Sequence, residues 1–261
     1  MAMSQALSHP RLNHLLATLP HDDYARISSQ IRSIPFTSRQ VLHKRDEPLH
    51  DIYFPSRSLC SLVMTMSDGS TAEIAVVGAE GFIGVEALLG PSRAMSDAIV
   101  QAAGDGVCHA LSIEAFRREC DRHEALYASV TAYRQAFVGF VTQSVACNGL
   151  HSADARCCRW LLHAHDRLVS DDLPLTHDLL ATMLAVRRPT VTLVMADLLQ
   201  VGIIATGRGS IRIADRAALE ARACECYEVV KRNFDRRLPV ARPRTLHVTD
   251  ASNNGSSDLA L

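Results

Sequence analysis

The chain has 261 residues, of which 48% are hydrophobic and 21% charged, and its formal net charge is −1 at pH 7. The length favours two domains, and the composition is typical of an ordinary soluble globular protein rather than a fibrous or disordered one. Because the net charge is close to zero, the chain as a whole does not indicate a polyanionic partner.

Short strands are predicted after a helical opening of about 35 residues. From Phe36 to about Leu111 the sequence consists of runs such as DIYFP, SLCSLVMTM and TAEIAVVG, separated by turn-forming residues such as Ser67-Asp68-Gly69-Ser70. Strands spaced roughly every 8–12 residues are typical of an antiparallel sandwich or barrel. Several glycines of this region are expected to serve tight turns between strands. We assign residues 1–120 to this domain.

A helix of roughly 25 residues is predicted from about Glu124 to Leu150. Its apolar residues recur at steps of three and four, and the stripe that they form runs from Leu126 through Phe137 to Val145 and Leu150. Such a helix is longer than one small domain needs. Two interpretations remain open, namely a connector or dimer seam over residues 121–151, or a long core helix.

The segment LTHDLLATMLAVRRPTVTLVMADLLQVGII, Leu175 to Ile204, places two arginines and a proline between two short apolar-periodic runs. Thr176 can cap the first helix. Pro189 suits the first position of the second helix, which would make Arg188 its N-cap. Two helices joined by so short a turn predict a helix-turn-helix within residues 152–238. Residues 239–261 are polar, and we expect a flexible tail there.

The first turn of the second helix would face the major groove of DNA. Arginine can bond both acceptors of guanine, and hydroxyl groups can reach phosphate oxygens. The following stretch, ATGRGSIRI, predicts a β-hairpin wing, and residues 186–213 contain four arginines and one aspartate, a local net charge of +3. Leu193 is expected either to touch a thymine methyl group or to be partly buried. We therefore predict DNA contacts from Thr176, Arg187, Arg188, Thr190, Thr192 and Arg208.

The order of these parts, the motif LTHDLLATMLAVRRPTVT and the segment from DIYFP to GVEALLG resemble the Crp/Fnr family of bacterial transcription regulators over about residues 30–235. The resemblance implies an α+β protein with an N-terminal β jelly-roll sensor domain of the cyclic-nucleotide-binding type, a long dimerisation helix and a C-terminal winged helix-turn-helix. It also implies a homodimer on a pseudo-palindromic double-stranded DNA operator, modulated by a signal at the sensor domain. RNA polymerase is a candidate partner.

Cyclic-nucleotide binders of that family place a Gly-Glu pair in a phosphate cassette and an arginine further on. Here Val85 follows Gly84, so that the carboxylate of Glu86 comes one place late. Ser96 stands at the arginine position, and the Asp97 that follows it would repel a phosphate. The candidate effector pocket therefore comprises Gly84, Glu86, Ser96 and Asp97, but these departures disfavour cyclic AMP. Another small molecule, or no ligand, is favoured, and the effector is left unnamed.

The eight cysteines predict no metal site and no cofactor. No cysteine precedes Cys60, as the family's iron–sulfur oxygen sensors would require, and Cys224-Glu225-Cys226 is not a CxxC motif. Adjacent Cys157 and Cys158 would point about 100° apart on a helix, and their spacing from His163 and His165 matches no zinc module. Buried thiols are expected, and a redox-sensing cysteine stays open.

The remaining motifs argue against an enzyme, an exported protein and a membrane protein. No GxSxG, Walker or HExxH motif occurs. The first residues lack the pattern of a signal peptide, and no run of about 18 uncharged apolar residues is present. We expect a cytoplasmic protein with reduced cysteines. The alternative function is a ligand-binding signalling module that acts through protein contacts without binding DNA.

Overall fold

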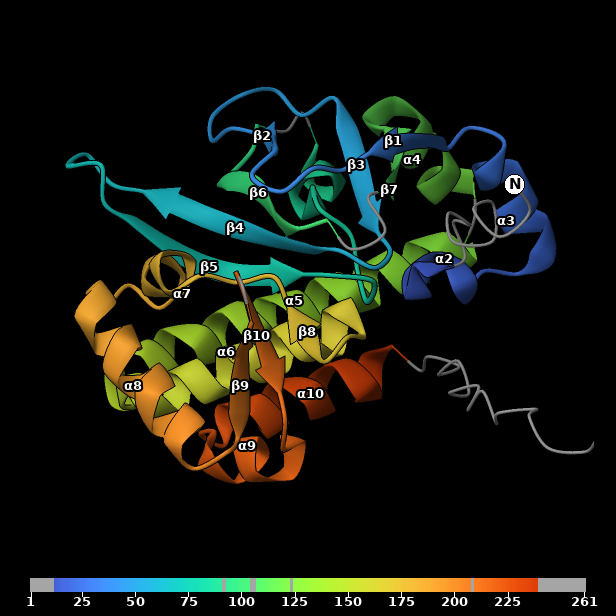
Figure 1. Ribbon diagram of the computed structural model, residues 1–261. Helices are drawn as coiled ribbons and strands as arrows, with labels where there is room; N and C mark the ends of the chain where they lie inside the picture. The colour runs from blue at the N-terminus through green and yellow to red at the C-terminus, as the bar shows by residue number, and fades with distance from the viewer. Residues whose placement is uncertain (1–11, 91–92, 104–106, 123, 208, 239–261) are drawn as a thin grey trace, which may run out of the picture.

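The computed structural model describes residues 12–90, 93–103, 107–122, 124–207 and 209–238 (Figure 1). An N-terminal β domain, a long helix and a helical C-terminal part carrying a helix-turn-helix follow one another, which confirms the predicted α+β class. The predicted tail at 239–261 lies outside the described residues. Among those described, no single helix is long and apolar enough to span a membrane, although α7 and α8 together would meet the same criteria as a bent pair.

Two antiparallel sheets form the N-terminal β domain, one with strand order β1-β7-β3 and the other with order β2-β6-β4-β5. Two short helices, α2 (His14–Ala17) and α3 (His21–Ser28), precede them, and the short 3-10 helix η2 (Val85–Leu89) lies between β5 and β6. The strands are β1 (Arg32–Pro35), β2 (Val41–His43), β3 (Asp51–Pro55), β4 (Leu59–Thr65), β5 (Thr71–Val77), β6 (Asp97–Ala102) and β7 (Val107–Ser112).

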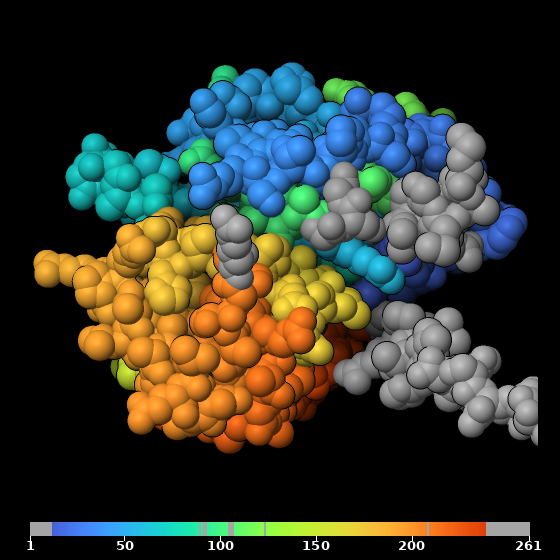
Figure 2. Space-filling view, viewed as in Figure 1, coloured from blue at the N-terminus to red at the C-terminus, as the bar shows by residue number. Residues whose placement is uncertain are grey.

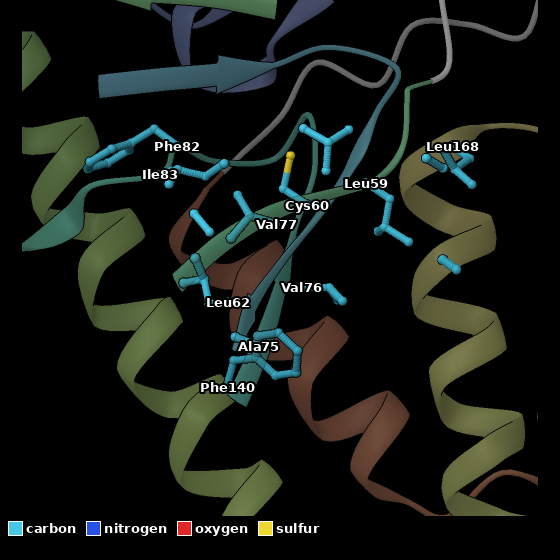
Figure 3. Packing of buried hydrophobic residues seen from close by; sticks show 14 of the residues in the cluster. Leu59, Cys60, Leu62, Ala75, Val76, Val77, Phe82, Ile83, Phe140 and Leu168 are labelled. Carbon is cyan, nitrogen blue, oxygen red and sulfur yellow. The ribbon is translucent and has the colours of Figure 1, made fainter. Parts of the chain in front are cut away.

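Strand β4 is buried from Leu59 to Val63 without the alternation expected of a strand with one solvent face. The cause is a second layer of helices, formed by α5 (Glu124–Leu150), α6 (Ala153–Leu168) and α7 (His177–Met183). These helices pack against β4 and β5 on the side away from the β-domain core. Figure 3 shows apolar side chains of β4 and β5 between the helix that carries Phe140 and the helix that carries Leu168. The two halves of the chain therefore share one continuous apolar core.

The long helix α5 (Glu124–Leu150) has 27 residues, about 40 Å at about 1.5 Å per residue. It follows α4 (Ile113–Arg122), and its core face is the predicted one as far as Phe140. The predicted stripe is wrong beyond that point, since Val145 is 70% exposed and Leu150 81%. Beyond Phe140 the buried residues of α5 are Ser144 and Cys147. Cys147 faces Cys224, which precedes the C-terminal helix, so that the buried side of α5 leaves Val145 and Leu150 in solvent.

Helix α10 (Cys226–Arg237) lies along α5, and this is the most extensive contact that either helix makes. Asn233 Nδ2 donates a hydrogen bond of 2.9 Å to the backbone carbonyl of Ala136. The close approach requires glycine at Gly139, where a Cβ atom would stand 2.6 Å from that amide nitrogen. The ring of Phe234 also packs against Tyr133 and Phe140, with centroids 6.1 and 6.2 Å away.

The C-terminal part begins with α6 and ends with α10. Between them a small sheet of order β8-β10-β9 flanks the helix pair α7 and α8, and its β9–β10 hairpin is the predicted wing. Its elements are α6 (Ala153–Leu168), β8 (Asp172–Leu173), α7 (His177–Met183), α8 (Arg188–Gln200), β9 (Ile204–Gly207), β10 (Ser210–Ile213) and α9 (Arg216–Arg222).

Candidate nucleic-acid interface and sensor site

The turn between α7 and α8 is built by a specific helix stop. Ala185 adopts a left-handed backbone with φ of 50°, its N–H donates to the carbonyl of Thr182, and the N–H of Val186 donates to that of Ala181. This pair of bonds is the Schellman arrangement, which satisfies the last carbonyls of a helix and reverses the chain at once. As a result α8 leaves α7 at 114°, within the range of helix-turn-helix pairs.

The start of α8 differs by one residue from the prediction. Arg187, not Arg188, is the N-cap, so that Arg188 is the first helical residue and Pro189 the second. Proline is still tolerated there because the N–H groups of the first turn have no partner within the helix. The side chain of Arg187 makes no capping bond, whereas Thr176 caps α7 as predicted by accepting the N–H of Leu179 at 3.2 Å.

The structure brings five of the six predicted contact residues to the outer edge of α7 and α8. Arg187, Arg188, Thr176 and Thr192 are exposed and Thr190 is half-buried, whereas Arg208 lies outside the described residues. The hydroxyl of Thr192 donates to the backbone carbonyl of Arg188 at 3.1 Å. Leu193 is 73% exposed on the same helix, which excludes the partly buried alternative.

Two acidic residues that sequence reasoning did not count reduce the positive charge of this edge. Arg188 Nε lies 3.3 Å from Asp178 Oδ1, and Arg212 Nε donates to Asp172 Oδ1 at 2.8 Å. The hydrogen bond from Arg212 lowers the pKa of Asp172. Since no ion pair of Arg187 occurs among the described residues, the available charge is concentrated at the start of α8. Asp178 was detectable in the sequence as the acidic residue of the first turn of α7.

The predicted effector residues also lie together in the β domain. Gly84 has φ of 102°, a conformation that favours glycine, and it is the N-cap of η2. Glu86 on η2 is buried, and its Oε1 accepts the N–H of Met95 at 2.9 Å, which joins this segment to Ser96 and Asp97. Asp97 accepts the N–H of Arg45 at 2.8 Å.

His43 is a member of this site that sequence reasoning missed. It is buried, and neither of its ring nitrogens has a hydrogen-bond partner among the described residues. Burial lowers its pKa, while the carboxylates of Glu86, Asp97 and Glu47 act in the opposite direction. Arg93, the arginine nearest in sequence, is exposed and donates to the backbone carbonyl of Asp46. A phosphate placed between Glu86 and Asp97 would meet like charges.

Comparison with known proteins identifies both halves. Residues 155–222 match the Crp-like helix-turn-helix domain, and residues 34–123 match the cyclic nucleotide-binding domain. The chain belongs to the Crp/Fnr family of transcription regulators. No curated protein matches the sequence.

Among solved Crp/Fnr structures, a CRP-family transcriptional regulator from Thermus thermophilus is 25% identical, with 74% of this chain and 96% of that chain covered and a TM-score of 0.61. FixK2 from Bradyrhizobium japonicum is 18% identical, with 74% and 98% covered and a TM-score of 0.65. The c-di-GMP responsive regulator CLP from Xanthomonas campestris is 14% identical, with 74% and 99% covered and a TM-score of 0.60. The last two show the fold alone.

In this Crp/Fnr chain the helix-turn-helix part is docked on the sensor domain by buried polar contacts that the sequence did not reveal. Trp160 Nε1 on α6 donates to Glu73 Oε1 on β5 at 2.7 Å, and Arg167 Nε donates to Glu80 Oε1 at 2.8 Å. Figure 2 shows the two parts in broad contact. The N-terminal β domain therefore contacts α6 directly as well as α5.

The segment that carries the predicted effector residues also abuts α5. The ring of Phe82 lies 5.0 Å from that of Tyr133, centroid to centroid, and both side chains are fully buried. A Cβ atom on Gly81 would stand 1.9 Å from Tyr133 Cε2. The glycine is thus needed for this close approach, and it also closes the predicted tight turn, since its N–H donates to the carbonyl of Gly78 at 3.3 Å. The ring of Phe234 on α10 lies 6.1 Å from that of the same tyrosine, centroid to centroid.

Cys157, His163 and His165, which all lie on α6, do not form a common site. His165 Nε2 faces Asp171 Oδ1 at 2.8 Å, and His163 is fully buried with a pKa lowered by desolvation. The Sγ atom of Cys157 points to Met195 Sδ at 4.0 Å. Within the described part of the chain these three residues therefore offer no converging set of ligands.

Proposed function

We propose that this protein is a dimeric, sequence-specific DNA-binding transcription regulator whose affinity for DNA is modulated by a signal at its sensor domain. The observation that supports it best is the start of α8, where Arg187 and Arg188 stand exposed at an uncapped helix end. The positive end of the helix dipole favours a phosphate there, and arginine adds bidentate recognition of guanine.

Each predicted contact has a role that its position allows. Arg187 and Arg188, at the leading end of α8, are assigned to base edges, while the hydroxyls of Thr176, Thr190 and Thr192 are assigned to phosphates. Arg208, which lies outside the described residues, is assigned to phosphates on the sequence prediction alone. Arg188 must leave its weak, exposed contact with Asp178 to reach DNA, which costs little because surface ion pairs contribute about 0–1 kcal/mol.

The dimer is proposed to form along α5. Its 27 residues include only Glu124 and Arg134 as charged side chains. Opposite the core face, an exposed stripe recurs at steps of three and four from Gln135 onward, and its members are Gln135, Val138, Thr142, Val145 and Gly149. This is the spacing of a helix–helix seam, and two copies paired here would carry two recognition helices. Half-sites about 34 Å apart on a pseudo-palindromic operator would follow.

The effector is proposed to differ from cyclic AMP. The carboxylates of Glu86 and Asp97 occupy the site, and the arginine expected to hold the cyclic phosphate is replaced by Ser96. A thermal-shift screen of nucleotides tests this directly. Stabilisation by several degrees with cyclic AMP would contradict the assignment, because a ligand that binds only the folded state raises its stability.

The test of DNA binding is selection of a site from random DNA, followed by a salt-dependent gel-shift assay with the full chain. The variant Arg187→Ala/Arg188→Ala should weaken binding by about 1–3 kcal/mol per base-reading arginine and reduce the salt slope. Arg57→Ala, an exposed arginine of the sensor domain, is the matched control and should bind normally.

Full operator affinity of the double variant would remove the recognition role from this edge. If no sequence were selected at all, the alternative of a signalling module acting through protein contacts would replace the proposal.

A further inference from the structure

Four side chains with metal-binding chemistry meet where α5 ends. Cys147 and His151 lie one helical turn apart, Cys224 comes from the loop between α9 and α10, and Cys226 is the first residue of α10. The Sγ atoms of Cys147 and Cys224 are 3.5 Å apart, and Cys226 Sγ is 3.5 Å from His151 Nδ1. All four potential ligand atoms lie within 4.8 Å of one another, and no other such group occurs among the described residues.

We propose that Cys147, His151, Cys224 and Cys226 bind a single Zn²⁺ ion. Three thiolates and one imidazole are a standard set for structural zinc, which is tetrahedral with Zn–S of about 2.3 Å and Zn–N of about 2.0 Å. At those lengths two sulfur ligands stand about 3.8 Å apart. The 3.5 Å between the Sγ atoms of Cys147 and Cys224 differs from this by a few tenths of an ångström. The four ligand atoms all lie within 4.8 Å of one another, so side-chain adjustments of up to about 1 Å would complete the site.

The neighbours of the cluster support the same conclusion. Zinc-bound histidines usually direct their second ring nitrogen to a carboxylate, and His151 Nε2 lies 3.2 Å from Glu225 Oε1 while Nδ1 faces the cysteines. Gln143 Nε2 donates to Cys226 Sγ at 3.0 Å, a contact that would stabilise a thiolate.

A disulfide explains these contacts less well. A bond between Cys147 and Cys224 would use two of the converging atoms and leave Cys226 and His151 without a role. An iron–sulfur cluster places several irons and sulfides between its cysteines and needs more room than a single ion. The soft, mixed ligand set favours zinc over magnesium or calcium, which prefer oxygen ligands.

The bound ion would fix the joint between the two halves of the chain. His151 and Ser152 form the short connection from α5 to α6, and the side chain of Ser152 caps α6. The α9–α10 loop would be tied to this connection, and α10 would be held along α5. The ion is therefore assigned a structural role at the joint, and the assignment does not depend on whether the protein binds DNA.

The experiment is a Co²⁺ titration of the full chain, purified under reducing conditions and stripped with a chelator. Co²⁺ reports on zinc sites because thiolate ligation gives a charge-transfer band and tetrahedral geometry gives intense visible bands. One Co²⁺ per chain is expected, displaced by Zn²⁺. Zn²⁺ should raise the melting temperature. Glu225→Gln should weaken binding about 10–100-fold, as typical for a lost outer-shell partner.

Three variants decide the outcome. Cys224→Ser/Cys226→Ser and His151→Gln should lose the bands or change them, and the half-buried His151 can be replaced without disturbing the core. Cys120→Ala, a buried cysteine of α4, is the matched control and should bind like the parent. The proposal is overturned if the parent protein shows no such bands, or if the bands are unchanged in the first two variants. It is equally overturned if the metal-free protein contains a Cys147–Cys224 disulfide under the conditions of purification.

Discussion

The burial of Glu73 on β5 beneath α6 makes the stability of this protein depend on pH. Burial between β5 and α6 raises the pKa of Glu73 from 4.5 to about 7, against the opposing effects of hydrogen bonds from Ser61 and Trp160. At a pH between these two pKa values, Glu73 is deprotonated in the unfolded chain but still protonated in the folded protein. Stability therefore falls as pH rises from about 4.5 to about 7, and changes little from this cause beyond that.

The size of this effect follows from the interval between the two pKa values. Each unit corresponds to about 1.4 kcal/mol, so the loss is at most about 3 kcal/mol. Glu73→Gln removes the charge but keeps an oxygen that can accept from Trp160 Nε1. We expect this variant to match the parent at pH 5 and to be more stable than it at pH 8, by up to about 3 kcal/mol.

The assay uses the single tryptophan of the chain as its reporter. Because the indole of Trp160 bonds Glu73 directly, its fluorescence should titrate with a midpoint of about 7 in the parent and stay flat in Glu73→Gln. Thermal unfolding at pH 5 and pH 8 supplies the stabilities. Glu114→Gln, an exposed carboxylate of α4, is the control. A destabilised Glu73→Gln at pH 8, or a fluorescence titration that persists in it, would refute the reasoning.

Three further predictions concern packing, backbone and assembly. Gly81→Ala places a methyl group against Tyr133 and should destabilise the protein by about 1–3 kcal/mol in thermal unfolding, whereas a change below about 0.5 kcal/mol would contradict the close approach. Ala185→Gly relieves the left-handed backbone and should stabilise by up to about 1 kcal/mol, and a loss of stability would contradict this. Val145→Glu places a charge in the proposed seam and should shift the chain to a monomer in sedimentation. Because Val145 is exposed in the single chain, the melting temperature of the monomer should not fall. An unchanged dimer would exclude the α5 stripe as the seam.

The sequence by itself determined the features that depend on neighbouring residues. Thr176 caps its helix, two helices follow with a short turn, and a glycine-containing hairpin comes after them, because caps and turns are set by local backbone sterics and hydrogen bonding. The one-residue error at Arg188 belongs to the same scale, since helix ends are the least sharply encoded part of a helix.

Only the tertiary structure decided which surfaces are covered. Val145 fits the apolar period of α5 yet is exposed, because α10 and the β domain pack against other sides of the helix. Glu73 is on a strand that looks half-exposed, and α6 covers it. Cys147 and Cys224 lie 77 residues apart and meet only after the chain has folded back. Such contacts are fixed by packing between distant segments, and no periodicity within one segment records them.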